Sequence, residues 1–228
     1  MKSLKGMSIL VTGGGSGIGL GTARYCIERG AKVTICGRRE DKIQAAAAEL
    51  GDACCGIAAD ITQAAERQKL LEAALDHGGP LDALINNAGN MYRGAITELD
   101  ETALQEVFHT NVIAAMMLTG LCTPSLAQQQ GAVVFVGSIH TRRAFPGASP
   151  YAATKAAVQG LTRVLAAELG EQKIRVNCLL PGAVFTEINQ RAGLMDDETA
   201  LQRLEGMSDL HALGRIGTTE EIAEAMAY

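Results

Sequence analysis

Short runs of apolar residues alternate with longer amphipathic stretches along the chain. The short runs predict β-strands at residues 7–11, 32–36, 53–58, 81–86, 132–137 and 174–179. The amphipathic stretches predict helices at residues 18–29, 41–50, 64–76, 101–127 and 150–169. This alternation is typical of a parallel sheet that is covered by helices on both faces.

The regular alternation stops after Pro181. We expect residues 182–218 to form a substrate loop with one short helix, and residues 220–228 to form another helix. With no long polar linker, the pattern predicts one α/β domain over residues 1–228, a Rossmann-like doubly wound parallel sheet. Because the chain ends at Tyr228 inside the last predicted helix, we expect the fold to lack a final C-terminal strand.

The turn after the first predicted strand is rich in glycine, with the sequence T-G-G-G-S-G-I-G at residues 12–19. Glycines let the backbone approach a phosphate closely, and the following helix offers free N–H groups and a positive dipole end. The stretch does not match G-x-G-x-x-G, and a purely structural turn is the alternative. The residues expected to bind a dinucleotide here are Thr12, Gly13, Gly15, Ser16, Gly17, Ile18 and Gly19.

Tyr151 and Lys155 lie four residues apart in a predicted helix, after Ser149 as its N-cap and Pro150 as its first residue. This spacing puts both side chains on one face, where an ammonium favours a phenolate. Titration of the phenol near neutrality needs its pKa lowered by about 3, or roughly 4 kcal/mol. An ordinary helix with one buried tyrosine and one solvated lysine is the alternative.

Two further polar residues adjoin this helix in the predicted topology. Ser138 follows a buried strand, where a hydroxyl can hydrogen-bond a substrate oxygen. Asn111 interrupts an apolar helix, where its amide could bend the helix and hold a water near Lys155. The alternative for Ser138 is a simple turn residue, and the alternative for Asn111 is a buried amide that is hydrogen-bonded to local backbone. His140 could face a substrate, although a lone histidine in a loop favours a solvated position.

The glycine turn also fits T-G-x-x-x-G-x-G, and other motifs follow in order. These are N-N-A-G at 86–89, Asn111, Ser138, Y-x-x-x-K at 151–155 and P-G-x-x-x-T at 181–186. In this ordered set the chain resembles the short-chain dehydrogenase/reductase family over nearly its whole length, and its 3-oxoacyl-acyl-carrier-protein reductase and glucose dehydrogenase-like members in particular. The resemblance implies hydride transfer between a nicotinamide cofactor and a carbonyl or secondary alcohol.

The resemblance also implies a role for each of four residues. Ser138 would position the substrate oxygen, and Tyr151 would be the general acid/base. Lys155 would bind the nicotinamide ribose and lower the pKa of Tyr151, while Asn111 would support a proton relay through water. The rival is a truncated or catalytically impaired nucleotide-binding protein of the same fold, and an epimerase or dehydratase is a further alternative.

Residues after the second predicted strand bear on the choice of cofactor. Gly37 stands where similar NAD enzymes carry an aspartate, and Arg38 and Arg39 follow it. Two guanidinium groups could clamp a 2′-phosphate, so NADP is expected over NAD, unless the arginines only begin an exposed helix. By resemblance, further cofactor contacts are Asp60 at the adenine, Asn87 and Gly89 at the ribose, Val184 and Thr186 at the nicotinamide amide, and also Ile61, Pro181 and Gly182.

Composition narrows the partners and the compartment. A net charge of −5 without a basic run argues against nucleic acid, and no apolar run approaches a membrane span. The six cysteines form no C-x-x-C pair or metal-ligand spacing, so we expect free thiols in the cytoplasm and no metal. The substrate is not readable. Expected pocket residues are Met91, Tyr92, His140, Arg142, Arg143, Phe145, Phe185 and 188–194.

Two predicted helices indicate self-association. The helix at 101–127 carries apolar residues on more than one face, among them Val107, Ile113, Met117 and Leu121. The helix at 150–169 has small residues that allow close approach. A second buried surface follows, and similar enzymes pair these helices across a two-fold axis. We expect a homodimer, with a homotetramer as the alternative that would also use a final strand.

Overall fold

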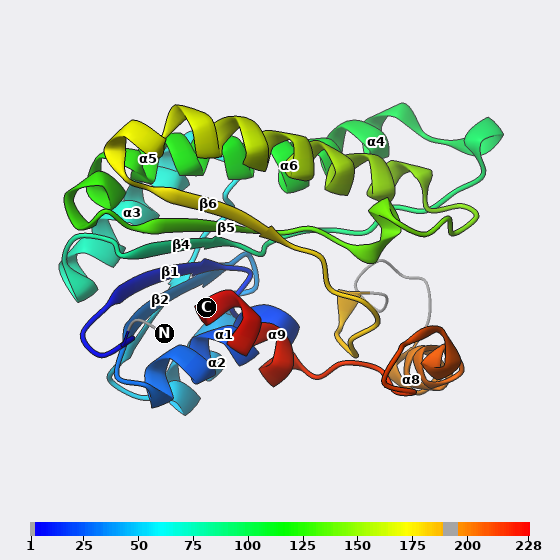
Figure 1. The fold of residues 1–228 in the computed structure, drawn as a ribbon, viewed down its shortest axis with the longest axis horizontal. Helices are drawn as coiled ribbons and strands as arrows, with labels where there is room; N and C mark the ends of the chain where they lie inside the picture. The colour runs from blue at the N-terminus through cyan, green and yellow to red at the C-terminus, as the bar shows by residue number, and fades with distance from the viewer. Residues whose placement is uncertain (1–2, 189–195) are drawn as a thin grey trace.

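The computed structural model describes residues 3–188 and 196–228. Its described part contains a six-stranded parallel sheet in the order β3-β2-β1-β4-β5-β6 (Figure 1). The strands are β1 (Ser8–Thr12), β2 (Lys32–Gly37), β3 (Cys54–Ala58), β4 (Ala83–Asn86), β5 (Ala132–Val136) and β6 (Arg175–Leu179). The predicted fold class is confirmed, and each predicted strand lies within two residues of an observed one.

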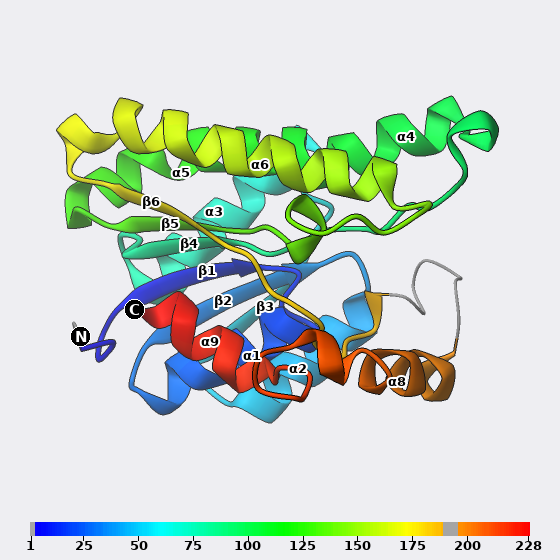
Figure 2. The ribbon, with the colours of Figure 1, turned by 45° about the vertical axis from the view of Figure 1, so that its right-hand side comes forward.

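Helices cover both faces of the sheet (Figures 1 and 2). One layer holds α3 (Ala64–Gly78), α4 (Glu101–Phe108), α5 (Ala114–Gln129) and α6 (Ser149–Glu168). The other layer holds α1 (Gly17–Glu28), α2 (Glu40–Leu50) and α9 (Thr219–Ala227). Short helical turns connect these elements: η1 (Ile96–Glu98), η2 (His109–Ile113), η3 (Ile139–Thr141), η4 (Gly170–Gln172) and η5 (Ser208–Leu210).

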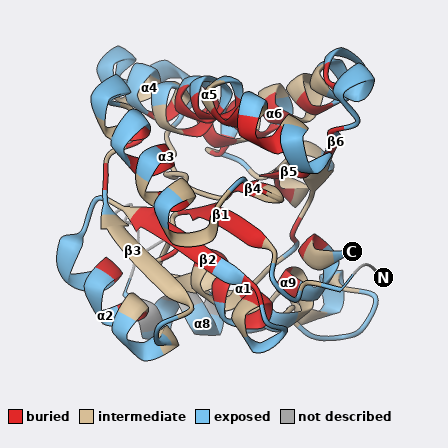
Figure 3. Cartoon of the chain, turned by 90° about the vertical axis from the view of Figure 1, so that its left-hand side faces the viewer, coloured by how far each residue is buried: buried red, intermediate tan, exposed pale blue. Residues whose placement is uncertain are grey.

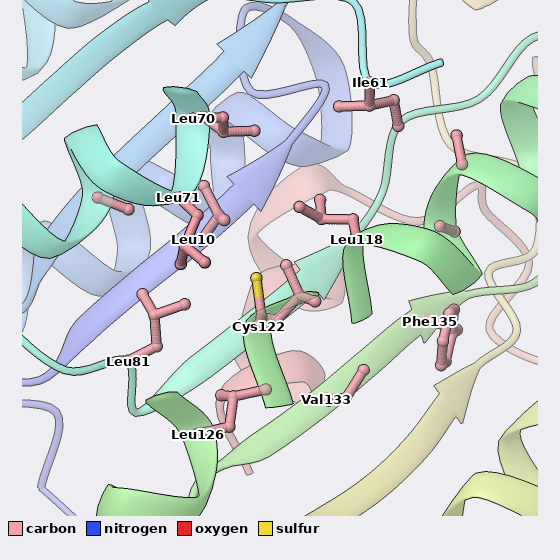
Figure 4. Close-up of a cluster of buried hydrophobic side chains, with 14 of the residues drawn as sticks. Leu10, Ile61, Leu70, Leu71, Leu81, Leu118, Cys122, Leu126, Val133 and Phe135 are labelled. Carbon is pink, nitrogen blue, oxygen red and sulfur yellow. The ribbon is translucent and has the colours of Figure 1, made fainter. Parts of the chain in front are cut away.

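The central strands are buried on both faces, as expected for a parallel sheet (Figure 3). Alternate residues of one strand therefore enter different cores. Leu10 packs with α3 and α5 residues such as Leu71 and Leu118 (Figure 4). Its neighbours Ile9 and Val11 pack with residues of α1, α2 and α9. This two-sided burial fixes the positions of the strand ends that carry the polar residues discussed below.

The strand order reverses direction between β1 and β4, which pair with Val11 opposite Ile85. In doubly wound sheets, ligands bind at the carboxyl ends of the strands on either side of such a switch point. Here the register brings the turn after Thr12 beside the residues that follow Asn86. The glycine turn and the N-N-A-G motif are therefore neighbours in space.

Two helix boundaries differ from the sequence expectation. The predicted helix at 101–127 contains a π-helical turn, η2, which includes Asn111 and separates α4 from α5. A π turn widens the helix locally, and here it lies at the buried amide of Asn111, where the sequence indicated a bend. Helix α6 begins one residue earlier than predicted, with Ala148 as its N-cap, so the expectation that Ser149 is the N-cap was wrong.

The helical run Glu101–Gln129 is long and apolar enough to cross a membrane, by length and composition alone. This corrects the expectation that no apolar run approaches the length of a span. Half of its most apolar window is buried inside the fold, and core helices meet the same criterion. Val107, expected on a second apolar face, is also buried in the core.

The region after β6 follows the sequence expectation of a loop with a short helix. Helix α8 (Asp197–Glu205) and η5 lie near the carboxyl ends of the strands (Figure 1). The predicted pocket positions 189–194 lie outside the described residues. Helix α9 is the last described element, and it packs against α1 with Met226 in the shared core.

Candidate functional site

Two cavities meet along the carboxyl ends of the strands. They share four lining residues, namely Gly13, Ser16, Met91 and Ile188. One cavity reaches Ser138, Tyr151 and Lys155, and the other reaches Arg38, Arg39 and Lys42. Together they form an elongated site with the glycine turn at its middle and a cationic region at one end.

Ser138, Tyr151 and Lys155 converge at the other end of this site. Ser138 follows β5, while α6 presents Tyr151 and Lys155 on one face, and all three side chains are buried. The Lys155 ammonium donates to the carbonyl oxygen of Val136 at 2.7 Å and lies 5.6 Å from the centre of the Tyr151 ring. The three residue types predicted from the sequence are thus brought together.

Burial dominates the proton affinity of this pair. It raises the pKa of Tyr151 to about 12, against a smaller lowering by a hydrogen bond with Ser138. It lowers the pKa of Lys155 to about 8, against a smaller raising by Cys178. The phenol is therefore protonated at neutral pH. The pKa of Tyr151 is thus raised overall. The hydrogen bond with Ser138 is the influence that lowers it, whereas the resemblance implied a lowering by Lys155.

The side chain of Asn111 is held by three hydrogen bonds to two residues. Its Oδ1 accepts from the backbone N–H of Asn90 at 2.8 Å, and its Nδ2 donates to Asn90 O at 2.9 Å and to Thr154 Oγ1 at 3.1 Å. A Cβ at Gly89 would lie 3.2 Å from Asn111 Oδ1 and 3.6 Å from Lys155 Nζ. Gly89 therefore leaves the space in which Asn111 and Lys155 face each other.

The glycine turn fits a pyrophosphate. Gly13 and Gly17 have positive φ angles of 67° and 54°, and a Cβ at Gly17 would lie 3.1 Å from Thr186 Cβ. Helix α1 has no acidic residue in its first turn, and Ser16 provides no side-chain cap. Its N-terminal N–H groups and positive dipole end therefore remain available to an anion.

Other motif residues hold the turn in place. Thr12 Oγ1 accepts from the backbone N–H groups of Asn87 and Ala88 at 3.1 and 3.0 Å. The Asn87 amide donates to the carbonyl oxygens of Thr12 and Gly13. A Cβ at Gly19 would lie 2.3 Å from Gly13 O. Thr12 and Gly19 thus act through packing and hydrogen bonds behind the turn.

One turn glycine was missing from the predicted set. A Cβ at Gly14 would lie 2.5 Å from Ile35 Cβ, so this position requires glycine for close approach to β2. The remaining predicted turn residues Gly15 and Ile18 each line one of the two cavities. The glycine-rich composition was the available signal for Gly14, but the motif spacing did not include it.

The P-G-x-x-x-T segment closes the site opposite the glycine turn. Pro181, Gly182, Val184 and Thr186 all line the first cavity, and the cofactor contacts that the resemblance implies for them stay predictions. His211, which sequence reasoning missed, accepts from the backbone N–H of Ala183 through Nε2 at 3.1 Å. Its Nδ1 lies 3.0 Å from the carbonyl oxygen of Met207, so His211 joins the loop to the start of η5.

Two residues at the cationic end of the site, Glu187 and Lys42, were not predicted from the sequence. Glu187 pairs with Arg39 at 2.7 Å and with Lys42 at 3.6 Å. Burial alone would raise the pKa of Glu187, but Arg39 and Lys42 outweigh it and hold that pKa below its usual range. Arg38 donates to Asn90 Oδ1 at 3.5 Å. Arg39, one of the two arginines expected to bind a 2′-phosphate, thus already pairs with the carboxylate of Glu187.

Some predicted residues lie elsewhere. The carboxylate of Asp60 accepts from the N–H and hydroxyl of Thr62, and the side chain of Ile61 is buried in the core (Figure 4). Neither residue is among the described lining of the two cavities. Their contact with a cofactor stays a prediction.

The predicted substrate residues divide in the same way. Met91, His140 and Phe145 line the first cavity, and Tyr92 lines the second. Arg142, Arg143 and Phe185 are exposed and are not among the described lining residues. Within 3–188 and 196–228, no three His, Cys, Asp or Glu side chains are grouped so that they could hold a metal ion.

Comparison with known proteins identifies the family to which this site belongs. The short chain dehydrogenase family model matches residues 7–197. This chain belongs to the short-chain dehydrogenase family. It is 32% identical to dehydrogenase/reductase SDR family member 4 of Sus scrofa, over 100% of this chain and 81% of that protein. It is 33% identical to L-fucose dehydrogenase of Bos taurus, over 98% of this chain and 82% of that protein.

Two solved structures extend the comparison. A short-chain dehydrogenase/reductase of unknown function from Caenorhabditis elegans, solved with cofactor, superposes with a TM-score of 0.93 at 27% identity, over 100% of this chain and 89% of that one. The 3-ketoacyl-(acyl-carrier-protein) reductase of Brucella melitensis, complexed with NADH, gives 0.89 at 32% identity, over 99% and 90%. The short-chain dehydrogenase fold and an oxidoreductase family that binds nicotinamide cofactors are therefore established for this chain.

Proposed function

We propose that this short-chain dehydrogenase transfers a hydride between NADP(H) and a carbonyl or secondary alcohol, with Tyr151 as the general acid/base. The observation that carries the proposal is the convergence of Ser138, Tyr151 and Lys155 at one end of a site whose middle is a phosphate-fitting glycine turn. The bound nicotinamide would supply or accept the hydride at the substrate carbon.

The residues of this chain would manage the proton and the substrate oxygen. With its pKa raised to about 12, Tyr151 holds a proton that it can give to the alkoxide oxygen formed during carbonyl reduction. Ser138 would hold the same oxygen by a hydrogen bond. Lys155 would bind the ribose hydroxyls, and Asn111, at the back of the site, would support a water-mediated return of the proton.

The NADP preference rests on the cationic end of the site. Arg38, Arg39 and Lys42 line the second cavity. Arg39 and Lys42 already bind a carboxylate, that of Glu187, which supports their capacity to bind a 2′-phosphate. NAD is the alternative cofactor, and direct titration with both reduced dinucleotides distinguishes them.

The proposed function is tested by Tyr151→Phe. Removing the phenolic hydroxyl should reduce turnover of a carbonyl substrate by at least about a hundredfold and leave cofactor affinity nearly unchanged, since the ring still fills its space. Absorbance of NADPH reports the turnover, and fluorescence titration reports the affinity. Turnover near that of the wild type would refute the role of Tyr151.

The substrate search uses a panel of ketones, 3-oxoacyl thioesters and sugars with NADPH, and the matching alcohols with NADP. Cofactor binding without turnover of any panel member would favour the rival reading, a nucleotide-binding protein of the same fold. We also propose that the protein works in the cytoplasm, since all six cysteines are free, as is usual in a reducing compartment.

We further propose a homodimer through α5 and α6. Ile113 at the end of η2, Met117 on α5 and Val164 on α6 are each about half exposed, at 49%, 54% and 54%. A Cβ at Gly120 or Gly160 would meet no heavy atom within 4 Å, so both helices leave room for close approach by another helix. A homotetramer is the alternative assembly.

A further inference from the structure

His140 lies inside the candidate site, which agrees with its place among the expected pocket residues and not with the solvated position that a lone histidine in a loop favours. It lines the first cavity in a half-buried position between two aromatic rings. Its ring centre is 4.5 Å from that of Phe145 and 5.2 Å from that of Tyr151, which it meets edge-on. The imidazole is therefore fixed beside the proposed acid/base.

The same imidazole contacts Ser138. His140 Nδ1 is 3.0 Å from Ser138 Oγ, and the backbone N–H of His140 donates to that oxygen at 3.2 Å. A serine hydroxyl has one proton and two acceptor positions. The backbone N–H takes one acceptor position. The imidazole takes either the serine proton or the second acceptor position, and the one that it leaves is open to Tyr151, which also hydrogen-bonds with Ser138, and to a substrate oxygen.

The two neutral tautomers divide them differently. When Nδ1 carries its proton, it donates to Ser138 Oγ, and the serine proton is left for an oxygen in the site. When Nε2 carries the proton, Nδ1 accepts the serine proton, and Ser138 Oγ is left as an acceptor. A ketone oxygen requires a donor, whereas an alcohol hydroxyl can donate to an acceptor.

We propose that His140 is a positioning residue for Ser138, one that lets the serine present a proton to a ketone and a lone pair to an alcohol. This inference rests on the proposed function. The pair gains or loses no proton overall, because a proton that leaves one ring nitrogen for water is matched by a proton that water gives to the other ring nitrogen. The imidazole acts through Ser138 and not on the reacting carbon.

The electrostatic surroundings keep the imidazole neutral. Burial lowers the pKa of His140, and the nearby charge of Arg93 lowers it further. An imidazolium would donate at both nitrogens and could not accept from Ser138. Among the described residues, those that contact the imidazole or act on its charge are Arg93, Phe145, Tyr151 and Ser138, and none of these is an anion that would favour the charged form.

Two substitutions test the hydrogen bond against the packing. His140→Phe keeps an aromatic ring between Phe145 and Tyr151 but removes Nδ1. His140→Asn places an amide that can donate or accept at the same distance along the side chain as Nδ1. For His140→Phe we expect a roughly tenfold lower kcat in both reaction directions, with unchanged cofactor affinity.

The rescue decides between the two explanations. His140→Asn should recover most of the lost kcat with both a ketone and its alcohol. Wild-type kcat in His140→Phe, or a His140→Asn variant as slow as His140→Phe, would overturn the proposal. If the wild type itself turns over no substrate of the panel, the proposed function fails, and the inference is then judged by the next measurement.

Nitrogen-15 NMR of histidine-labelled protein tests the contact without turnover. We expect the His140 ring signals, assigned through His140→Phe, to be those of a neutral imidazole at pH 7 and to shift in Ser138→Ala. The signals of His77, His109 and His211 serve as internal references. Unchanged His140 signals in Ser138→Ala would overturn the proposal.

Discussion

At the scale of single residues, burying the ammonium of Lys155 in the site lowers the free energy of unfolding. Its pKa of about 8 lies below the value of about 10.4 for a free lysine. Between these pH values the unfolded chain binds more protons than the folded one. The free energy of unfolding therefore rises with pH through this window, while below pH 8 the cost of burying the charge is present in full.

This sign predicts the effect of Lys155→Met. Relative to the variant, the wild type should gain about 2 kcal/mol in unfolding free energy between pH 7 and pH 9.5. Urea unfolding at several pH values, in the absence of cofactor, measures the difference. A pH-independent difference between the two proteins would show that Lys155 is not a buried titrating amine. The raised pKa of Tyr151 acts in the opposite direction, but only above pH 10.

In the proposed NADP complex, Glu187 would compete with the 2′-phosphate for Arg39. In Glu187→Gln the carboxylate charge is lost, so the affinity for NADPH should rise severalfold, roughly three- to tenfold, with little change for NADH. Glu40→Gln is the matched control, because Glu40 is also an acidic residue beside Arg39 but belongs to the first turn of α2. Isothermal titration with both dinucleotides measures the effect. An equal gain for NADPH in both variants would indicate only a change in overall charge.

At the scale of elements, the hydroxyl of Thr154 joins η2 to α6. It accepts from Asn111 Nδ2 at 3.1 Å and donates to Tyr151 O at 2.8 Å. Thr154→Val keeps the shape and removes this link, so we expect a loss of about 1–2 kcal/mol in unfolding free energy. Thr123→Val on α5 is the control, since the Thr123 hydroxyl donates to Thr119 O in its own helix. Equal losses in urea unfolding would contradict a linking role.

The sequence predicted the strands well because each is a short apolar run, and the central strands are buried on both faces. It located Ser138, Tyr151 and Lys155 through spacing along the chain, which the sheet topology converts into proximity. The π turn at Asn111 was not predictable as such. Its buried amide satisfies its hydrogen bonds with Asn90 and Thr154, and these partners come from other elements.

The missed residues share one physical reason. Glu187, which follows β6, meets the predicted Arg39, which follows β2, and His211 reaches Ala183 from the residue after η5. Such pairs depend on how loops from different strands meet, which a periodic pattern does not encode. For the same reason His140 could be placed beside Ser138 in sequence but not between Phe145 and Tyr151 in space.

At the scale of the whole molecule, the exposed apolar residues of α5 predict the assembly. Met117→Glu should convert a dimer into a species close to the 23.9 kDa of one chain, because it would bury a charge in the interface. Leu213→Glu is the control, since Leu213 is also exposed but lies beyond η5. Light scattering during size-exclusion chromatography reports the mass. A wild type that is already a monomer at micromolar concentration would refute the dimer.

The packing of α9 on α1 has a consequence for folding during synthesis on the ribosome. Helix α1 is synthesised long before α9, whose Met226 packs in the same core. Until α9 is made, the apolar side of α1 beside the glycine turn has no permanent cover. Exposed apolar surface of this kind invites aggregation and chaperone binding. A nucleotide site assembled from both halves of the described chain is therefore completed only after the second half has been made.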